Sequence, residues 1–134
     1  PRTGSMDIAT YYMSNFLCGY SKAILERAIE GGYNFLNALL ASETCSEMNR
    51  TAEHFELLNL VPEEKFFLTF LDMPFKIEDH TVKHYVKQTR LKILDKLSET
   101  YGVDVSDEAL LKAVEEHNEV CRLMTAFFIK KQKK

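Results

Sequence analysis

Two short apolar runs, each ending in polar residues, most constrain what this chain can fold into. Residues 36–42 read Leu-Asn-Ala-Leu-Leu-Ala-Ser, and residues 66–71 read Phe-Phe-Leu-Thr-Phe-Leu. Continuous apolar runs of this length are typical of strands that are buried on both faces of a parallel sheet. Pro74 ends the second run, because proline cannot extend a strand ladder. The two runs predict strands of an α/β sheet.

Amphipathic segments lie before, between and after these runs. Apolar spacing predicts helices over residues 21–29, 46–58 and 77–101. Gly31-Gly32 is expected to stop the first helix and Gly102 to close the third, because glycine readily adopts the left-handed conformation at helix ends. Ser106 is expected to cap a last helix that runs to the basic tail of residues 130–134.

This order of elements predicts part of a parallel α/β layer over residues 6–76, followed by a long helical hairpin over residues 77–134. Two strands make a poor sheet by themselves, so we interpret the chain as a piece of a larger structure rather than one that borrows strands from a partner. Residues 1–5 precede Met6 and are interpreted as a tag remnant or an interior start.

Composition excludes several classes of protein. The chain has 134 residues, 46% of them hydrophobic and 28% charged, which is typical of a soluble globular protein with one core. A net charge of −3 argues against nucleic acid as a partner. No apolar run reaches the ~18 residues that a membrane span needs, and no signal peptide is visible. Three cysteines predict a reducing, cytoplasmic setting rather than a disulfide framework.

Cys45 follows the first apolar run, at the end of a strand where ligands of open α/β folds collect. Cys18 precedes the first helix, 27 positions earlier, and no Cys-x-x-Cys motif joins the two. The residues alone therefore leave two alternatives open, a shared metal site and two buried structural thiols. Cys121 lies on the apolar stripe of the last helix, where cysteine usually acts as a small hydrophobe.

Other polar candidates have ordinary explanations. His80 and His84 are four apart on one helical face, but the glutamate and third ligand of a zinc motif are missing, which favours solvent exposure. Asn49 and Arg50 could present a donor beside Cys45, although an exposed helical arginine is the more common case. His117 is interpreted as a surface or helix-packing residue. No phosphate-binding glycine loop and no serine nucleophile elbow occurs.

In combination, several segments resemble the 2-hydroxyacyl-CoA dehydratase and benzoyl-CoA reductase family, in particular the D-component of 2-hydroxyglutaryl-CoA dehydratase. The resemblance runs from about Asp7 to Met124. It is carried by the order and spacing of residues 17–22 (LCGYSK), 30–36 (EGGYNFL), 44–45 (TC), 70–74 (FLDMP), 80–90, 101–110 (YGVDVSDEAL) and 118–123 (NEVCRL).

The resemblance implies a chain that is only part of a longer subunit built of two Rossmann-like lobes. It implies a [4Fe–4S] cluster held by three cysteines, with Cys18 and Cys45 as the first two ligands and the third beyond residue 134. Thiolates are the ligands that iron–sulfur clusters require. It further implies an acyl-CoA substrate, a partner dehydratase subunit and an ATP-dependent activator. Asn37 and Ser46 stand where the family often has acidic residues, which places the chain in a divergent branch.

Two hypotheses of function follow from the resemblance. The first is a fragment of an iron–sulfur lyase of anaerobic metabolism, inactive alone, whose complete form eliminates water from 2-hydroxyacyl-CoA thioesters by a ketyl-type radical. Whether it is a dehydratase or a related reductase stays open. The second is a non-catalytic accessory or assembly protein of the same family, which binds no cluster and uses its apolar helices to assemble with partner chains.

Overall fold

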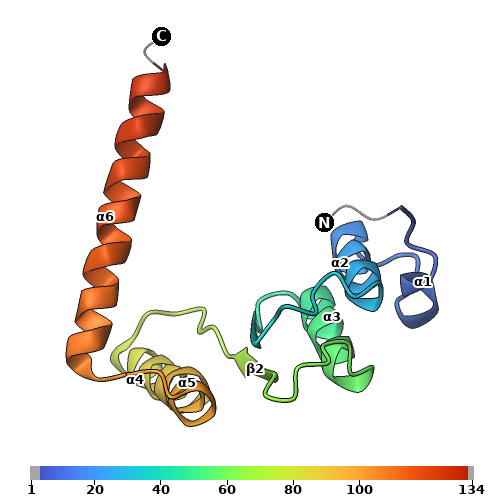
Figure 1. The fold of residues 1–134 in the computed structure, drawn as a ribbon, viewed down its shortest axis with the longest axis horizontal. Coiled ribbons are helices and arrows are strands. Elements are labelled where there is room, and N and C mark those ends of the chain that lie inside the picture. Colours follow the sequence, from blue (N-terminus) through green and yellow to red (C-terminus); the bar gives the residue numbers. More distant parts are fainter. Residues whose placement is uncertain (1–3, 133–134) are drawn as a thin grey trace. The chain divides into compact units, whose positions relative to one another are not determined.

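The computed structural model describes residues 4–132 and, for the side chains, residues 4–129. The chain divides into two compact units, the first ending at Ile93 and the second beginning at Leu94. The first unit holds α1 (Ala9–Tyr12), α2 (Gly19–Ile29), β1 (Ala38–Ser42), α3 (Ser46–Leu57), β2 (Phe67–Leu71), α4 (Asp79–Thr89) and most of a π-helical turn (Arg90–Leu94) (Figure 1). The second holds α5 (Asp95–Tyr101) and α6 (Asp107–Gln132).

The two predicted strands form a parallel pair. β1 and β2 align from Ala38 opposite Phe67 to Ser42 opposite Leu71. Parallel neighbours need a crossover connection, and α3 supplies it. The predicted mixed α/β architecture, with a lobe followed by helix, is therefore confirmed. The observed strands begin one or two residues later than the apolar runs.

The glycine pair ends α2 as the sequence predicts. Gly31 has a φ of 78°, and its N–H donates to the carbonyl of Ala28 at 2.9 Å. The N–H of Gly32 donates to the carbonyl of Arg27, also at 2.9 Å. These two bonds are the Schellman motif, which satisfies carbonyls at the helix end. The chain thereby leaves α2 and turns toward β1.

The single helix predicted over residues 77–101 is found as α4, a π-helical turn and α5. Gln88 at the end of α4 is almost fully buried, and its amide donates to the carbonyl of Asp72 at 2.6 Å while accepting the N–H of Asp72 at 3.0 Å. The ammonium of Lys92, within the π-helical turn, donates to the carbonyl of Phe70 at 2.7 Å. These bonds attach the helix to the carboxyl end of β2. Gly102, with a φ of 66°, closes α5 as expected.

Ser106 caps α6 as predicted, because its hydroxyl accepts the N–H of Ala109 at 3.3 Å. Asp107 and Glu108 occupy the first turn, where carboxylates interact favourably with the positive end of the helix. None of the described helices combines the length and apolar character needed to cross a membrane. Hairpin packing of the last helices, and a division at residues 76 and 77, stay predictions.

A buried carboxylate holds the N-terminal segment against α2. Glu26 is 2% exposed and accepts the N–H of Ala9 at 2.6 Å and that of Ile8 at 3.4 Å, so it satisfies donors at the start of α1. One turn earlier, the ammonium of Lys22 donates to the carbonyl of Asn15 at 3.0 Å. Around these contacts, the apolar side chains of Ala9, Met13 and Leu25 form a buried cluster.

We expect Glu26→Ala to lower the free energy of unfolding by about 2 to 3 kcal/mol, because it leaves buried N–H groups without an acceptor. Glu30→Ala is the matched control at the C-cap of the same helix, since Glu30 is exposed and forms an ion pair with Arg27 at 3.5 Å; it should cost less than about 1 kcal/mol. Urea unfolding followed by circular dichroism measures both. Equal losses in the two variants would contradict the assigned role of Glu26.

Candidate functional site

Cys45 lies just beyond the carboxyl end of β1, as the sequence predicts, and its thiol is exposed. A tight turn connects the strand to α3. In that turn the N–H of Glu43 donates to the carbonyl of Leu71 at 2.9 Å, and the hydroxyls of Ser42 and Thr44 lie 3.1 Å apart. Cys45 is the N-cap residue of α3, with extended backbone angles. Its side chain therefore stands at the positive end of a twelve-residue helix.

Cys18 occupies the equivalent position on α2. It is the N-cap residue, its thiol is exposed, and its carbonyl accepts the N–H of Lys22 at 3.1 Å. The N–H of Cys18 donates to the Oε2 carboxylate oxygen of Glu47 at 3.3 Å. Glu47 lies two residues after Cys45, so this bond joins the starting turns of α2 and α3. The alternative of two buried structural thiols is wrong, because both thiols are exposed.

The N-terminus of α2 favours the thiolate form of Cys18. The backbone N–H of Ser21 lowers the pKa of the Cys18 thiol most, and the N–H of Tyr20 and the Ser21 hydroxyl add to this. Desolvation and the charge of Glu47 oppose the shift, but the net pKa remains lowered. The thiol makes no capping hydrogen bond of regular geometry. The helix N-terminus therefore stabilises the thiolate form of Cys18 rather than the neutral thiol, as expected for a cysteine at this position.

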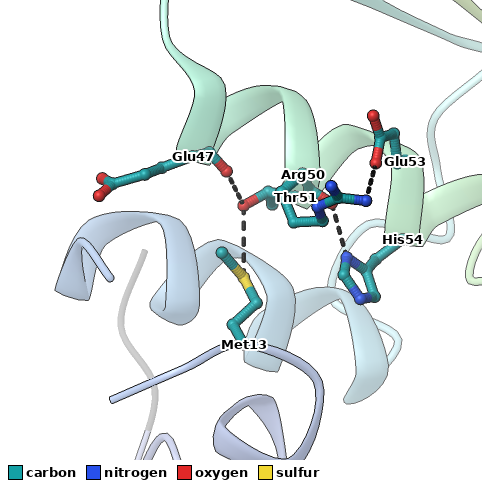
Figure 2. A network of polar contacts seen from close by, with 6 residues as sticks. All are labelled: Met13, Glu47, Arg50, Thr51, Glu53 and His54. Atoms are coloured by element: carbon teal, nitrogen blue, oxygen red, sulfur yellow. Dashed lines mark hydrogen bonds and ion pairs between the residues drawn. The ribbon is translucent and has the colours of Figure 1, made fainter. Parts of the chain in front are cut away.

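The packing of α2 against α3 sets where the two cysteines lie. Thr51 is 1% exposed, and its hydroxyl lies 3.0 Å from the Glu47 carbonyl, 3.4 Å from the Ser21 carbonyl and 3.7 Å from the Met13 sulfur. Figure 2 shows the Thr51 hydroxyl between the carbonyl of Glu47 and the sulfur of Met13. A second contact runs from the Ser21 hydroxyl to the Met48 sulfur at 3.3 Å. Small polar residues thus bring the two helices close together.

An apolar cavity of about 410 Å³ opens beside Cys45. β1 contributes Leu40 and Ser42 to its lining, and α3 contributes Met48 and Phe55. Concave apolar sites with a few polar groups at one side are the usual form of small-molecule sites. Ser42 and Cys45 are among the few polar groups of this cavity.

The histidines of the chain contribute no site. His80 and His84 are exposed, as the sequence predicts. His54 is buried instead, and its Nδ1–H donates to the carbonyl of Arg50 at 2.6 Å (Figure 2). Its ring meets that of Tyr12 edge-on. Its contacts are those of a packing residue. Within residues 4–132, no group of three or more histidine, cysteine, aspartate or glutamate side chains is arranged to hold a metal ion.

Arg50, Asn49 and Cys121, the remaining candidates from the sequence, lie in different environments. Arg50 is exposed and forms an ion pair with Glu53 at 2.5 Å, which is the common role of a helical arginine (Figure 2). Asn49 differs, because its side-chain oxygen is buried and has no hydrogen-bond partner among the described residues. Cys121 is exposed rather than packed in a core, and its sulfur lies 3.4 Å from Nε2 of His117.

Sequence reasoning missed Glu47. The residue looks like an ordinary acidic residue in the first turn of a helix, which the helix dipole alone explains. Its contact with Cys18 spans 29 positions of sequence. In the sequence, a carboxylate close to Cys45 is only weak evidence for a functional site. The packing of α2 on α3 is what brings Glu47 to Cys18 and connects the two cysteine-bearing turns.

Comparisons with known proteins identify the family of this chain. The family model described as 2-hydroxyglutaryl-CoA dehydratase, D-component, matches residues 1–134. A curated relative, the beta subunit of (R)-phenyllactyl-CoA dehydratase from Clostridium sporogenes, is 25% identical over 119 residues. The match covers 89% of this chain and 31% of the relative, so the chain spans about a third of that protein's length. No solved structure matches the chain.

The lowered pKa of Cys18 predicts that its alkylation by iodoacetamide starts at a lower pH than that of free cysteine, because the thiolate is the reacting form. The midpoint of the rate–pH profile, measured by mass spectrometry in a Cys45→Ser, Cys121→Ser background, checks this. Ser21→Ala should raise the midpoint by removing the side-chain hydrogen bond, and Glu47→Gln should lower it by removing a negative charge. A midpoint at or above that of free cysteine would refute the assignment.

Proposed function

The chain belongs to the 2-hydroxyglutaryl-CoA dehydratase D-component family, and on that premise we propose that the complete protein eliminates water from 2-hydroxyacyl-CoA thioesters. In this proposal, Cys18 and Cys45 supply two thiolate ligands of a [4Fe–4S] cluster. The third ligand comes from residues beyond this chain. A partner subunit and an ATP-dependent activator complete the enzyme, and the chain by itself is inactive.

One observation carries the proposal. Two exposed thiols occupy the N-cap positions of two helices that pack on each other, and the Glu47 carboxylate joins their first turns at 3.3 Å from the Cys18 N–H. Exposed thiolates at helix N-termini are reactive or metal-binding, whereas structural cysteines are usually buried. The carboxyl end of a parallel strand, where Cys45 lies, is the usual ligand side of an α/β sheet.

The donor set fits such a cluster in part. Sulfur is the ligand that iron–sulfur clusters need, and amide N–H groups directed at sulfur stabilise its negative charge. The lowered pKa of Cys18 favours the ligating thiolate at neutral pH. The first compact unit contains no cysteine other than Cys18 and Cys45, so the proposal takes its third ligand from residues beyond this chain. When bound, such a cluster supplies one electron and an iron that can act as a Lewis acid.

The cavity beside Cys45 gives the substrate a place in this proposal. Its lining is mostly apolar, with Leu40, Met48 and Phe55 around a space of about 410 Å³. An apolar acyl group can be buried there with its thioester end toward the exposed Cys45 thiol. Burial of apolar surface would supply binding energy at about 25 cal/mol per Å² of apolar area. The name of the curated relative, a dehydratase, favours water elimination over reduction.

Anaerobic reconstitution of the natural full-length protein with iron and sulfide tests the proposal. We expect a brown protein with visible iron–sulfur absorption, and expect Cys18→Ser and Cys45→Ser each to lose most of the bound iron. Cys121→Ser is the matched control and should keep it, since Cys121 lies on α6 in the other compact unit.

Two results would contradict the proposal. Full iron binding in Cys45→Ser would remove that residue from the ligand set. A colourless wild-type protein, with correct folding shown by circular dichroism, would favour the non-catalytic accessory role instead.

A further inference from the structure

α6 presents an apolar surface without a partner among the described residues. At least half of each of its large apolar side chains from Leu111 to Ile129 is exposed. The set is Leu111, Val114, Val120, Leu123, Met124, Phe127, Phe128 and Ile129. The helix has 26 residues and is therefore about 39 Å long. In water, an exposed apolar surface of this kind favours association with another apolar surface.

One stripe of six residues along α6 follows a heptad pattern, and it includes Val114, Met124 and Phe128 of the exposed set. Leu110, Val114, His117, Cys121, Met124 and Phe128 recur at alternating steps of four and three residues. This average of 3.5 is the period of residues that form the seam of a coiled coil. The contact of the Cys121 sulfur with His117 Nε2 at 3.4 Å shows that the middle of the stripe shares one helix face.

The stripes of two copies of α6 also match each other when the helices run in opposite directions. About residue 119, Leu110 is opposite Phe128, Val114 opposite Met124, and His117 opposite Cys121. An antiparallel pair of helices places such residues in the same layers. Two apolar layers on each side would then enclose a central pair of more polar layers. Polar layers of this kind specify the register of a coiled coil at some cost in stability.

The charges of the segment favour the same direction. Residues 107–119 hold five acidic residues and one lysine, a net charge of −4, whereas residues 120–134 hold five basic residues and no acidic one. Two parallel copies would place like charges side by side. Two antiparallel copies place the acidic half of one beside the basic half of the other, and complementary charges of this kind select orientation.

We propose that α6 is the docking surface for a second copy of this chain, with the two α6 helices packed as an antiparallel coiled coil centred on residue 119. The apolar layers supply the affinity, because exposed ion pairs contribute little. The opposite charges of the two halves, and the His117 and Cys121 layers, set direction and register.

Sedimentation of the 134-residue chain with EDTA, over a range of concentrations, tests the association without metal bridging. We expect a monomer–dimer equilibrium, and expect Met124→Asp to raise its dissociation constant at least about 30-fold, because a charge would be buried in the seam. Ala126→Asp is the matched control on the opposite helix face, and should leave the dissociation constant within about threefold. Monomer at all concentrations, or a dimer unaffected by Met124→Asp, would overturn the proposal and leave another segment or partner as the occupant.

Disulfide trapping tests the direction. Val114→Cys and Met124→Cys are made separately in a background in which Cys18, Cys45 and Cys121 are serine, and one of the two carries a mass tag. The antiparallel pair predicts a disulfide mainly in the mixture of the two variants, between unlike chains. Disulfides that form equally well within each variant alone would indicate parallel helices and overturn the proposal, as would a dimer in which no mixed disulfide forms.

Discussion

The close contact of α2 with α3 is the constraint on which the candidate site depends. Thr51 sits in that contact, where its hydroxyl approaches the carbonyls of Glu47 and Ser21 and the sulfur of Met13. One hydroxyl proton cannot satisfy all three acceptors at once, so the donor is shared and the geometry around it is tight. Because each helix begins at a cysteine, the offset of one helix along the other also sets the distance between the Cys18 and Cys45 thiols.

Buried polar groups hold the lobe around that contact. Glu26 and Lys22 have ionisable side chains, yet both are buried and bonded to backbone groups of the N-terminal segment. Gln88 attaches α4 to the end of β2 in the same way. Buried polar groups cost free energy unless they are hydrogen-bonded, so each of them restricts its segment to one arrangement. The lobe has only a two-stranded sheet and a small apolar core. These buried hydrogen bonds therefore help to fix the positions of its segments.

The two compact units have different chemical characters. The first holds the exposed thiols, the lowered pKa of Cys18 and the apolar cavity next to Cys45. The second ends in a helix with exposed apolar residues and with its charges divided between an acidic and a basic half. Under the proposals for Cys18, Cys45 and α6, the function of this chain would require additional protein, from the rest of its own length or from a partner.

The sequence by itself determined the features that depend on neighbouring residues. Apolar runs predicted β1 and β2, glycines at 31 and 102 predicted helix ends, and Ser106 predicted the start of α6. It also located Cys45 at the end of a strand, and the motifs around it indicated the family. These signals succeed because strand burial, capping and left-handed backbone angles are decided within a few residues.

Only the tertiary structure decided how distant residues meet. It showed that the thiols are exposed rather than buried, that Glu47 reaches Cys18 across 29 positions, and that Glu26 and His54 are interior residues. An acidic residue in a helix has the same local pattern whether it faces water or caps another helix. Its environment is set by which helix packs on it, and that packing depends on contacts between residues far apart in the chain.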